Sequence, residues 1–148
     1  MSYGPPHWER TSLPAPVIPW EDTFESFLEL EWIELGPESA HVKIAVRENL
    51  KQPLGLLHGG IYSAVAETVA SVATVSRVWE DGYIGSGLSN YASFLRPVTE
   101  GTLDVFAKLR GHDDREWTWG HEFRDEDERL CALVEVTIAV RPVATPPS

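Results

Sequence analysis

The sequence predicts an α+β domain in which one long helix lies across a single curved antiparallel sheet of about six strands. Apolar and polar residues alternate through most of the chain between residues 28 and 141, a pattern typical of half-buried strands. Only residues 60–79 depart from this alternation, because their apolar residues recur every three or four positions, as in a helix. Short hairpin-like turns join most of the strands, which indicates antiparallel pairing.

The 148 residues are enough for one domain with its own core. We expect a proline-rich arm over residues 1–22, a folded domain over residues 23–142 and a flexible tail over residues 143–148. Five prolines in the arm exclude a regular helix or an inner strand. Trp8 and Trp20 indicate that this arm nonetheless packs against something.

The first strand is expected at residues 28–33, where Leu28, Leu30 and Trp32 alternate with two glutamates. A Gly36-Pro37 turn leads to the second strand, which is expected at residues 42–46. The other four strands are expected at residues 83–97, 103–110, 117–123 and 130–141. An acidic, solvated turn over residues 125–128 precedes the last strand.

The helix over residues 60–79 carries an apolar stripe that must be buried against the sheet. The stripe is rich in β-branched residues, so helix propensity alone does not explain it and burial has to stabilise it. Its members are Ile61, Val65, Val69 (or Thr68), Val72, Val75 and Trp79.

The net charge of −11 argues against a nucleic-acid partner, whose phosphates would be repelled. Cys131 is the single cysteine, so it forms no internal disulfide, and its apolar surroundings favour a buried structural role over a catalytic thiol. Since no signal peptide and no bilayer-length apolar run stand out, a cytoplasmic protein without a membrane partner is expected.

Two features of the predicted helix indicate chemistry. Gly59 and Gly60 open it, and the unpaired N–H groups of a helix start can stabilise an oxygen that becomes negative during a reaction. Glu67 is the one charged residue between Gly60 and Ser76, in line with Ser63 and Ser71 at intervals of four. We expect a half-buried carboxylate between these two hydroxyls, the alternative being a Glu67 that simply faces solvent.

The spacing between the helix start and the acid has a consequence for assembly. Gly59 precedes Glu67 by eight residues, about 12 Å of helix, so the two groups of one chain cannot contact the same carbonyl. If they cooperate, they come from two copies of the chain. The sequence therefore predicts a homodimer with two equivalent shared sites.

Several segments resemble one known family. The run GLLHGGIYSAVAE over residues 55–67 and the run SNYASFLRPV over residues 89–98 resemble the acyl-CoA thioesterases of the hotdog fold. Residues 129–132 and 138–142 share this resemblance. Within that family the chain looks closest to the phenylacetic-acid-degradation type and to the 4-hydroxybenzoyl-CoA thioesterases that use Glu. The resemblance covers residues 50–142, without the arm.

The resemblance implies a role for each matching residue of the reaction site. The backbone N–H of Gly59 would polarise the thioester carbonyl, and Glu67 of the facing subunit would act as nucleophile or as base towards water. Gln52 matches a residue beside the carbonyl, and Ser71 one that positions the carboxylate or its water. His58 matches a His that shapes the glycine turn.

Substrate binding is expected to involve Gly60, Ser63, Asn90, Arg96 and Arg115. Arg96 matches a family arginine for the CoA phosphates, and Arg115 could replace contacts that this chain has lost. Acidic neighbours such as Asp114 would oppose phosphate binding. The family also implies dimers that pair into tetramers and no cofactor, since CoA is part of the substrate.

The leading hypothesis is hydrolysis of an acyl-CoA thioester, with an aromatic or arylacetyl acyl group, to the free acid and CoA. One alternative is a non-catalytic hotdog protein that binds acyl-CoA. Another is a hydroxyacyl-thioester dehydratase, which would need a catalytic His in addition to the acid. Neither a metal-ligand pattern nor a Gly-x-Ser-x-Gly nucleophile motif stands out in the sequence.

Overall fold

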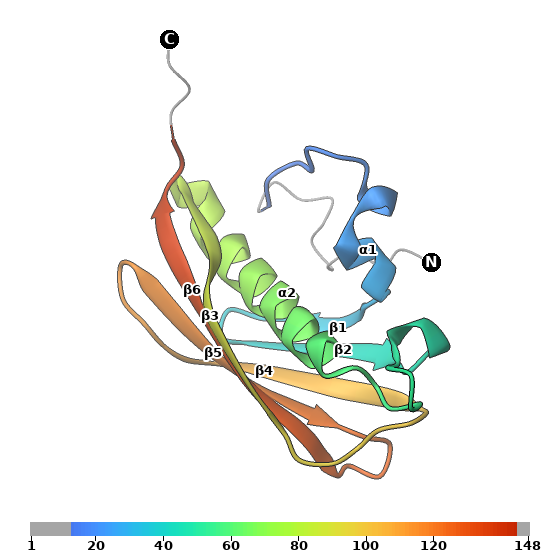
Figure 1. The fold of residues 1–148 in the computed structure, drawn as a ribbon. Coiled ribbons are helices and arrows are strands. Elements are labelled where there is room, and N and C mark those ends of the chain that lie inside the picture. The colour runs from blue at the N-terminus through green and yellow to red at the C-terminus, as the bar shows by residue number, and fades with distance from the viewer. Residues whose placement is uncertain (1–12, 145–148) are drawn as a thin grey trace.

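The computed structural model describes residues 13–144 and confirms the α+β architecture (Figure 1). The long helix α2 (Gly59–Val78) crosses one face of a six-stranded antiparallel sheet whose order is β1-β2-β4-β5-β6-β3. The strands are β1 (Glu31–Leu35), β2 (Ser39–Ala45), β3 (Tyr83–Phe94), β4 (Thr102–His112), β5 (Glu116–Arg124) and β6 (Leu130–Pro142). Short 3-10 turns occur at η1 (Trp20–Asp22), η2 (Glu48–Leu50) and η3 (Trp79–Asp81). Consequently β1 and β3 are the two edges of the sheet.

The start of the first strand differs from the sequence prediction. Residues 24–28 form the short helix α1 (Phe24–Leu28), and β1 begins only at Glu31. The Thr23 side chain accepts a hydrogen bond from the Ser26 N–H at 3.1 Å and so caps this helix. Glu29 ends it with a left-handed φ of 52°. The prediction that the strand begins at residue 28 was therefore wrong. Leu28 is buried, but it is the last residue of a helix.

The α2 helix begins and ends within one residue of its predicted bounds, but its buried face is wider than the predicted stripe. Small residues at Ala66, Ala70 and Ala73 are fully buried along with Val65 and Val69. Alanines let the helix axis approach the sheet closely, so the packing face is built as much from small as from branched side chains.

The inward-facing side chains of β5 join the sheet to the helix. Trp119 is fully buried, and its indole N–H donates to the Thr74 hydroxyl of α2 at 2.9 Å. Two positions along the strand, the buried His121 has its Nδ1 at 3.0 Å from the carbonyl oxygen of Val134. Its Nε2 has no hydrogen-bond partner within the described part of the chain, and burial lowers the pKa of His121 to about 4.

α1 lies on the same side of the sheet as α2 (Figure 1) and is fastened to the end of β2 by Arg47. The Arg47 guanidinium donates to the carbonyl oxygens of Phe27 and Leu28 and lies 5.1 Å from the centre of the Phe27 ring. These bonds satisfy carbonyl groups at the helix C-terminus, where a positive charge is favourable. Of the two arm tryptophans, Trp20 is half-buried, and Trp8 lies outside the described residues.

Within residues 13–144, no helix has the length and apolar character needed to cross a bilayer.

Candidate active site

The start of α2 is shaped by His58 and leaves one backbone donor unused. His58 is the N-cap residue, and its Nδ1 accepts the Gly60 N–H at 2.8 Å. The Gly60 N–H is therefore occupied by the turn itself. Among the described residues the Gly59 N–H has no hydrogen-bond partner, so it is the donor that this helix start can offer to a ligand.

Gly59 lies beside the C-terminal end of the edge strand β3. A Cβ added at Gly59 would stand 3.0 Å from Cζ of Phe94, the last residue of β3. Phe94 in turn packs 5.6 Å from the ring of Tyr62, one turn into the helix. A side chain at position 59 would therefore displace an aromatic ring from the helix start.

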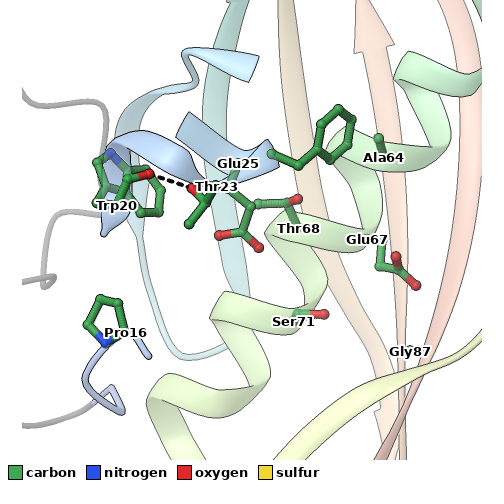
Figure 2. Close-up of a pocket in the computed structure, with 10 residues that line it drawn as sticks. Pro16, Trp20, Thr23, Glu25, Ala64, Glu67, Thr68, Ser71 and Gly87 are labelled. Carbon is green, nitrogen blue, oxygen red and sulfur yellow. Dashed lines mark hydrogen bonds between the residues drawn. The ribbon is translucent and has the colours of Figure 1, made fainter. Parts of the chain in front are cut away.

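Glu67 lies two turns further along α2 and points towards β3 (Figure 2). A Cβ added at Gly87 would overlap Oε1 of Glu67 and stand 3.0 Å from its Cδ. The expectation of a half-buried carboxylate between Ser63 and Ser71 is wrong for the single chain. There Glu67 is exposed and makes no hydrogen bond to either serine, because it extends across the helix edge to the bare backbone of Gly87.

A cavity of about 550 Å³ covers the face of α2 that carries Glu67 (Figure 2). Its helix wall includes Ala64, Thr68 and Ser71, and Gly87 belongs to its β3 end. The opposite wall comes from residues before the first strand. These are Pro16, Trp20, Thr23, Phe24 and Glu25. The volume lies in the range of small-molecule sites.

This opposite wall was missed by the sequence analysis. Glu25 contributes a second carboxylate to the cavity, and burial raises its pKa above the usual value. Nothing in the sequence marked Glu25, because its approach to α2 depends on α1, a helix that the sequence analysis did not predict. The contact at Gly87 could have been predicted, since a glycine inside a strand often marks a close approach of another group.

Comparison with known proteins places this arrangement in one family. The sequence model of the thioesterase superfamily matches residues 54–132, which contain α2 and Glu67. The chain belongs to the thioesterase superfamily. The fold is accordingly the hotdog fold, with the long helix packed on the sheet, and the family consists of thioester hydrolases.

Three similar proteins illustrate the match. The 1,4-dihydroxy-2-naphthoyl-CoA hydrolase of Escherichia coli is 30% identical over 141 residues, covering 90% of this chain and 98% of the relative. The crystal structure of thioesterase HI1161 from Haemophilus influenzae has a TM-score of 0.78 at 28% identity, covering 86% and 88% of the two chains. That of mutant thioesterase PA1618 from Pseudomonas aeruginosa has a TM-score of 0.79 at 24% identity, covering 83% and 88%, and supports the fold.

Three other residues expected in the thioesterase site make bonds within the chain. The Gln52 side chain accepts a hydrogen bond from the Leu54 N–H inside the loop before α2. The Asn90 amide donates to the Ser63 carbonyl oxygen at 3.0 Å and ties β3 to the helix. Ser63 thus contacts β3 through its backbone carbonyl oxygen. Gln52 lies at the Gly59 end of α2, away from Glu67.

The two arginines expected at the CoA phosphates do not lie together in one thioesterase chain. Arg96 follows the C-terminal end of β3, where its N–H donates to the Cys131 carbonyl oxygen. The Arg115 carbonyl oxygen accepts from Val140, which pairs with Gly85 near the opposite end of β3. Both side chains are exposed, so a single chain cannot bring them to one phosphate cluster.

The described part of the thioesterase, residues 13–144, contains no cluster of three or more His, Cys, Asp or Glu side chains suited to a metal ion.

Proposed function

We propose that this thioesterase hydrolyses aromatic or arylacetyl thioesters of CoA to the free acid and CoA. Glu67 supplies the nucleophile or general base, and the Gly59 N–H of the partner subunit polarises the thioester carbonyl. The observation that carries the proposal is the place of Glu67, at one end of a ligand-sized cavity and against the backbone of Gly87. The chain itself supplies these groups, and CoA enters as part of the substrate, so the proposed reaction needs no cofactor.

The lining of the cavity supports an aromatic acyl group. Trp20 and Phe24 face the helix that carries Glu67, and aromatic rings of ligands pack favourably against such side chains. The Escherichia coli relative is named for a thioester of a dihydroxynaphthoic acid, a substrate of this class. Both observations support an aromatic acyl group as a class. The resemblance of the sequence to thioesterases that act on aromatic acyl groups agrees with this.

The edge strand β3 supports a dimer that would bring the two catalytic groups together. Glu67 lies by Gly87 and Gly59 lies by Phe94, positions seven residues, or about 23 Å, apart on β3. If two β3 strands pair antiparallel about a two-fold axis close to Asn90 and Tyr91, Gly87 of one subunit comes to lie near Phe94 of the other. The same pairing places Glu67 beside the Gly59 N–H of the partner subunit and covers the edge.

The exposed side chains of β3 agree with a covered strand. Tyr91 is 75% exposed and Leu88 is 57% exposed in the single chain. Large apolar side chains gathered on one sheet edge commonly mark an interface. The same two-fold would bring Arg115 of one subunit towards the end of β3 that carries Arg96 of the other, and pairs of such dimers would form the proposed tetramer.

Two chemical routes fit this arrangement. In one, the Glu67 carboxylate attacks the thioester carbon, the C–S bond breaks, and water hydrolyses the resulting anhydride. In the other, Glu67 takes a proton from water, whose oxygen attacks the carbon directly. In both routes the carbonyl oxygen gains negative charge next to the N–H of Gly59, and the CoA thiolate leaves and takes up a proton.

The test is thiol release from a panel of CoA thioesters by the wild type and by Glu67→Ala and Glu67→Gln. We expect turnover to fall by about 10²–10⁴-fold in both variants while the oligomer and its melting temperature persist. Glu80→Ala is the matched control, because Glu80 is exposed in η3 outside the cavity. Near-normal thiol release by Glu67→Ala would refute the assignment.

The same panel separates the alternatives. An acyl-CoA-binding protein would bind the thioesters without releasing thiol, and a dehydratase would form an enoyl product. Aliphatic, phenylacetyl and hydroxybenzoyl groups, each on CoA and on pantetheine, test the acyl class and the contribution of the nucleotide. Equal rates on CoA and pantetheine would show that Arg96 and Arg115 contribute little.

A further inference from the structure

The cavity on α2 has a carboxylate at each end. Glu67 lies at its β3 end, and Glu25 lies at the end formed by α1, on the other side of the helix (Figure 2). Between them the lining is mostly apolar, with the Thr68 and Ser71 hydroxyls as the polar groups on the helix. A thioester carbonyl held at Glu67 would thus direct the far end of its acyl group towards Glu25.

The α1 wall is part of the folded domain. Leu28, at the end of α1, is fully buried in the core, and Arg47 binds the last carbonyl groups of the helix. Thr23 caps its start and also donates to the Trp20 carbonyl oxygen at 2.7 Å. Glu25 therefore projects from an element fixed at both ends, which a residue needs in order to select between substrates.

The Glu25 side chain has no protein partner that accounts for its place. Within residues 13–144 its carboxylate makes no hydrogen bond or ion pair, although it is half-buried and burial raises its pKa. A position in the first turn of a helix favours an acid, but it does not require the acid to face a cavity. A partly desolvated carboxylate without a partner costs free energy, which a ligand donor would offset.

We infer that Glu25 is a specificity-determining residue that accepts a hydrogen bond from a donor, such as a phenolic hydroxyl, on the far side of an aromatic acyl group. Trp20 and Phe24 pack against the ring. Among residues 13–144 the cavity lining holds two carboxylates and no basic side chain, so acyl groups with a carboxylate of their own are disfavoured. This inference rests on the proposed function, because it takes Glu67 as the place of the thioester carbonyl.

The experiment compares kcat/KM for matched CoA thioesters. The panel contains 3- and 4-hydroxybenzoyl and 6-hydroxy-2-naphthoyl thioesters, each with its methoxy and unsubstituted counterpart. We expect the wild type to prefer at least one hydroxyl compound about tenfold over both counterparts, the effect of a hydrogen bond to a charged group. Glu25→Leu should bring this ratio close to one, and Glu25→Gln should retain part of it, because the amide oxygen still accepts.

Glu21→Leu is the matched control, since Glu21 is an exposed acid of η1 outside the cavity, and it should keep the wild-type ratio. A second measurement uses the wild type alone, where the hydroxylated product acids should inhibit more strongly than their methoxy analogues. An unchanged ratio in a folded Glu25→Leu, or no hydroxyl preference in rate and inhibition, would overturn the inference. Absence of thiol release from every thioester would instead overturn the proposed function.

Discussion

Gly87→Ala is the variant that tests most directly how Glu67 is positioned. The new Cβ would occupy the place of the Glu67 carboxylate oxygen and lie 3.0 Å from Cδ and 3.5 Å from Cγ. The carboxylate must therefore move by about 1 Å, and a misplacement of that size can cost up to about 100-fold in rate. We expect kcat to fall by about 10–100-fold.

Stability should change little in the same variant, and this separates positioning from folding. Glu67 is exposed and its side chain can rotate away, and alanine in a strand is favoured over glycine by about 0.5–1 kcal/mol. The assay is kcat and KM for the best thioester of the panel, with the melting temperature measured on the same samples. KM should move less than kcat, because the displaced group acts on the transition state.

Two other glycines provide controls. A Cβ at Gly111 in β4 would meet no atom within 4 Å, so Gly111→Ala should keep both rate and stability. A Cβ at Gly85 would stand 2.8 Å from Cγ2 of the buried Ile138, so Gly85→Ala should lower the melting temperature. Wild-type kcat in a folded Gly87→Ala would show that the contact with β3 does not position the carboxylate.

Three further predictions concern stability and assembly. Because burial lowers the pKa of His121 from 6.5 to about 4, the folded state binds fewer protons than the unfolded state between these values. The free energy of unfolding should therefore be highest above about pH 6.5 and fall by up to ~3 kcal/mol towards pH 4 in urea titrations, a slope that His121→Leu should reduce. Thr74→Val leaves the buried Trp119 N–H without its acceptor and should lower the free energy of unfolding by about 1–3 kcal/mol, whereas an unchanged urea midpoint would contradict this. Tyr91→Arg places like charges at the proposed two-fold, so the enzyme should elute as a monomer and lose thioesterase activity; an active monomer would refute the shared site.

Much of the fold could be predicted because its signals are local. The alternation within β5 and β6 and the helical period of α2 repeat over nine or more residues, so their bounds were correct within one or two positions. The helix start was equally accessible, since the sequence shows a glycine pair after His58 and a single charged residue, Glu67, between Gly60 and Ser76. α1 was missed because five residues are too few to show a period, and its cap at Thr23 competes with an alternation that continues into β1.

The amino-acid sequence by itself determined the α+β class, the place of the long helix and the identity of Glu67 and Gly59 as the groups to examine. Only the tertiary structure decided that Glu67 lies against Gly87, that Glu25 faces the same cavity from α1, and that β3 is left as an unpaired edge. The physical reason is range: periodicity and capping depend on residues a few positions apart, whereas the cavity joins residues 16–25 to residues 64–87 through packing that no local pattern encodes.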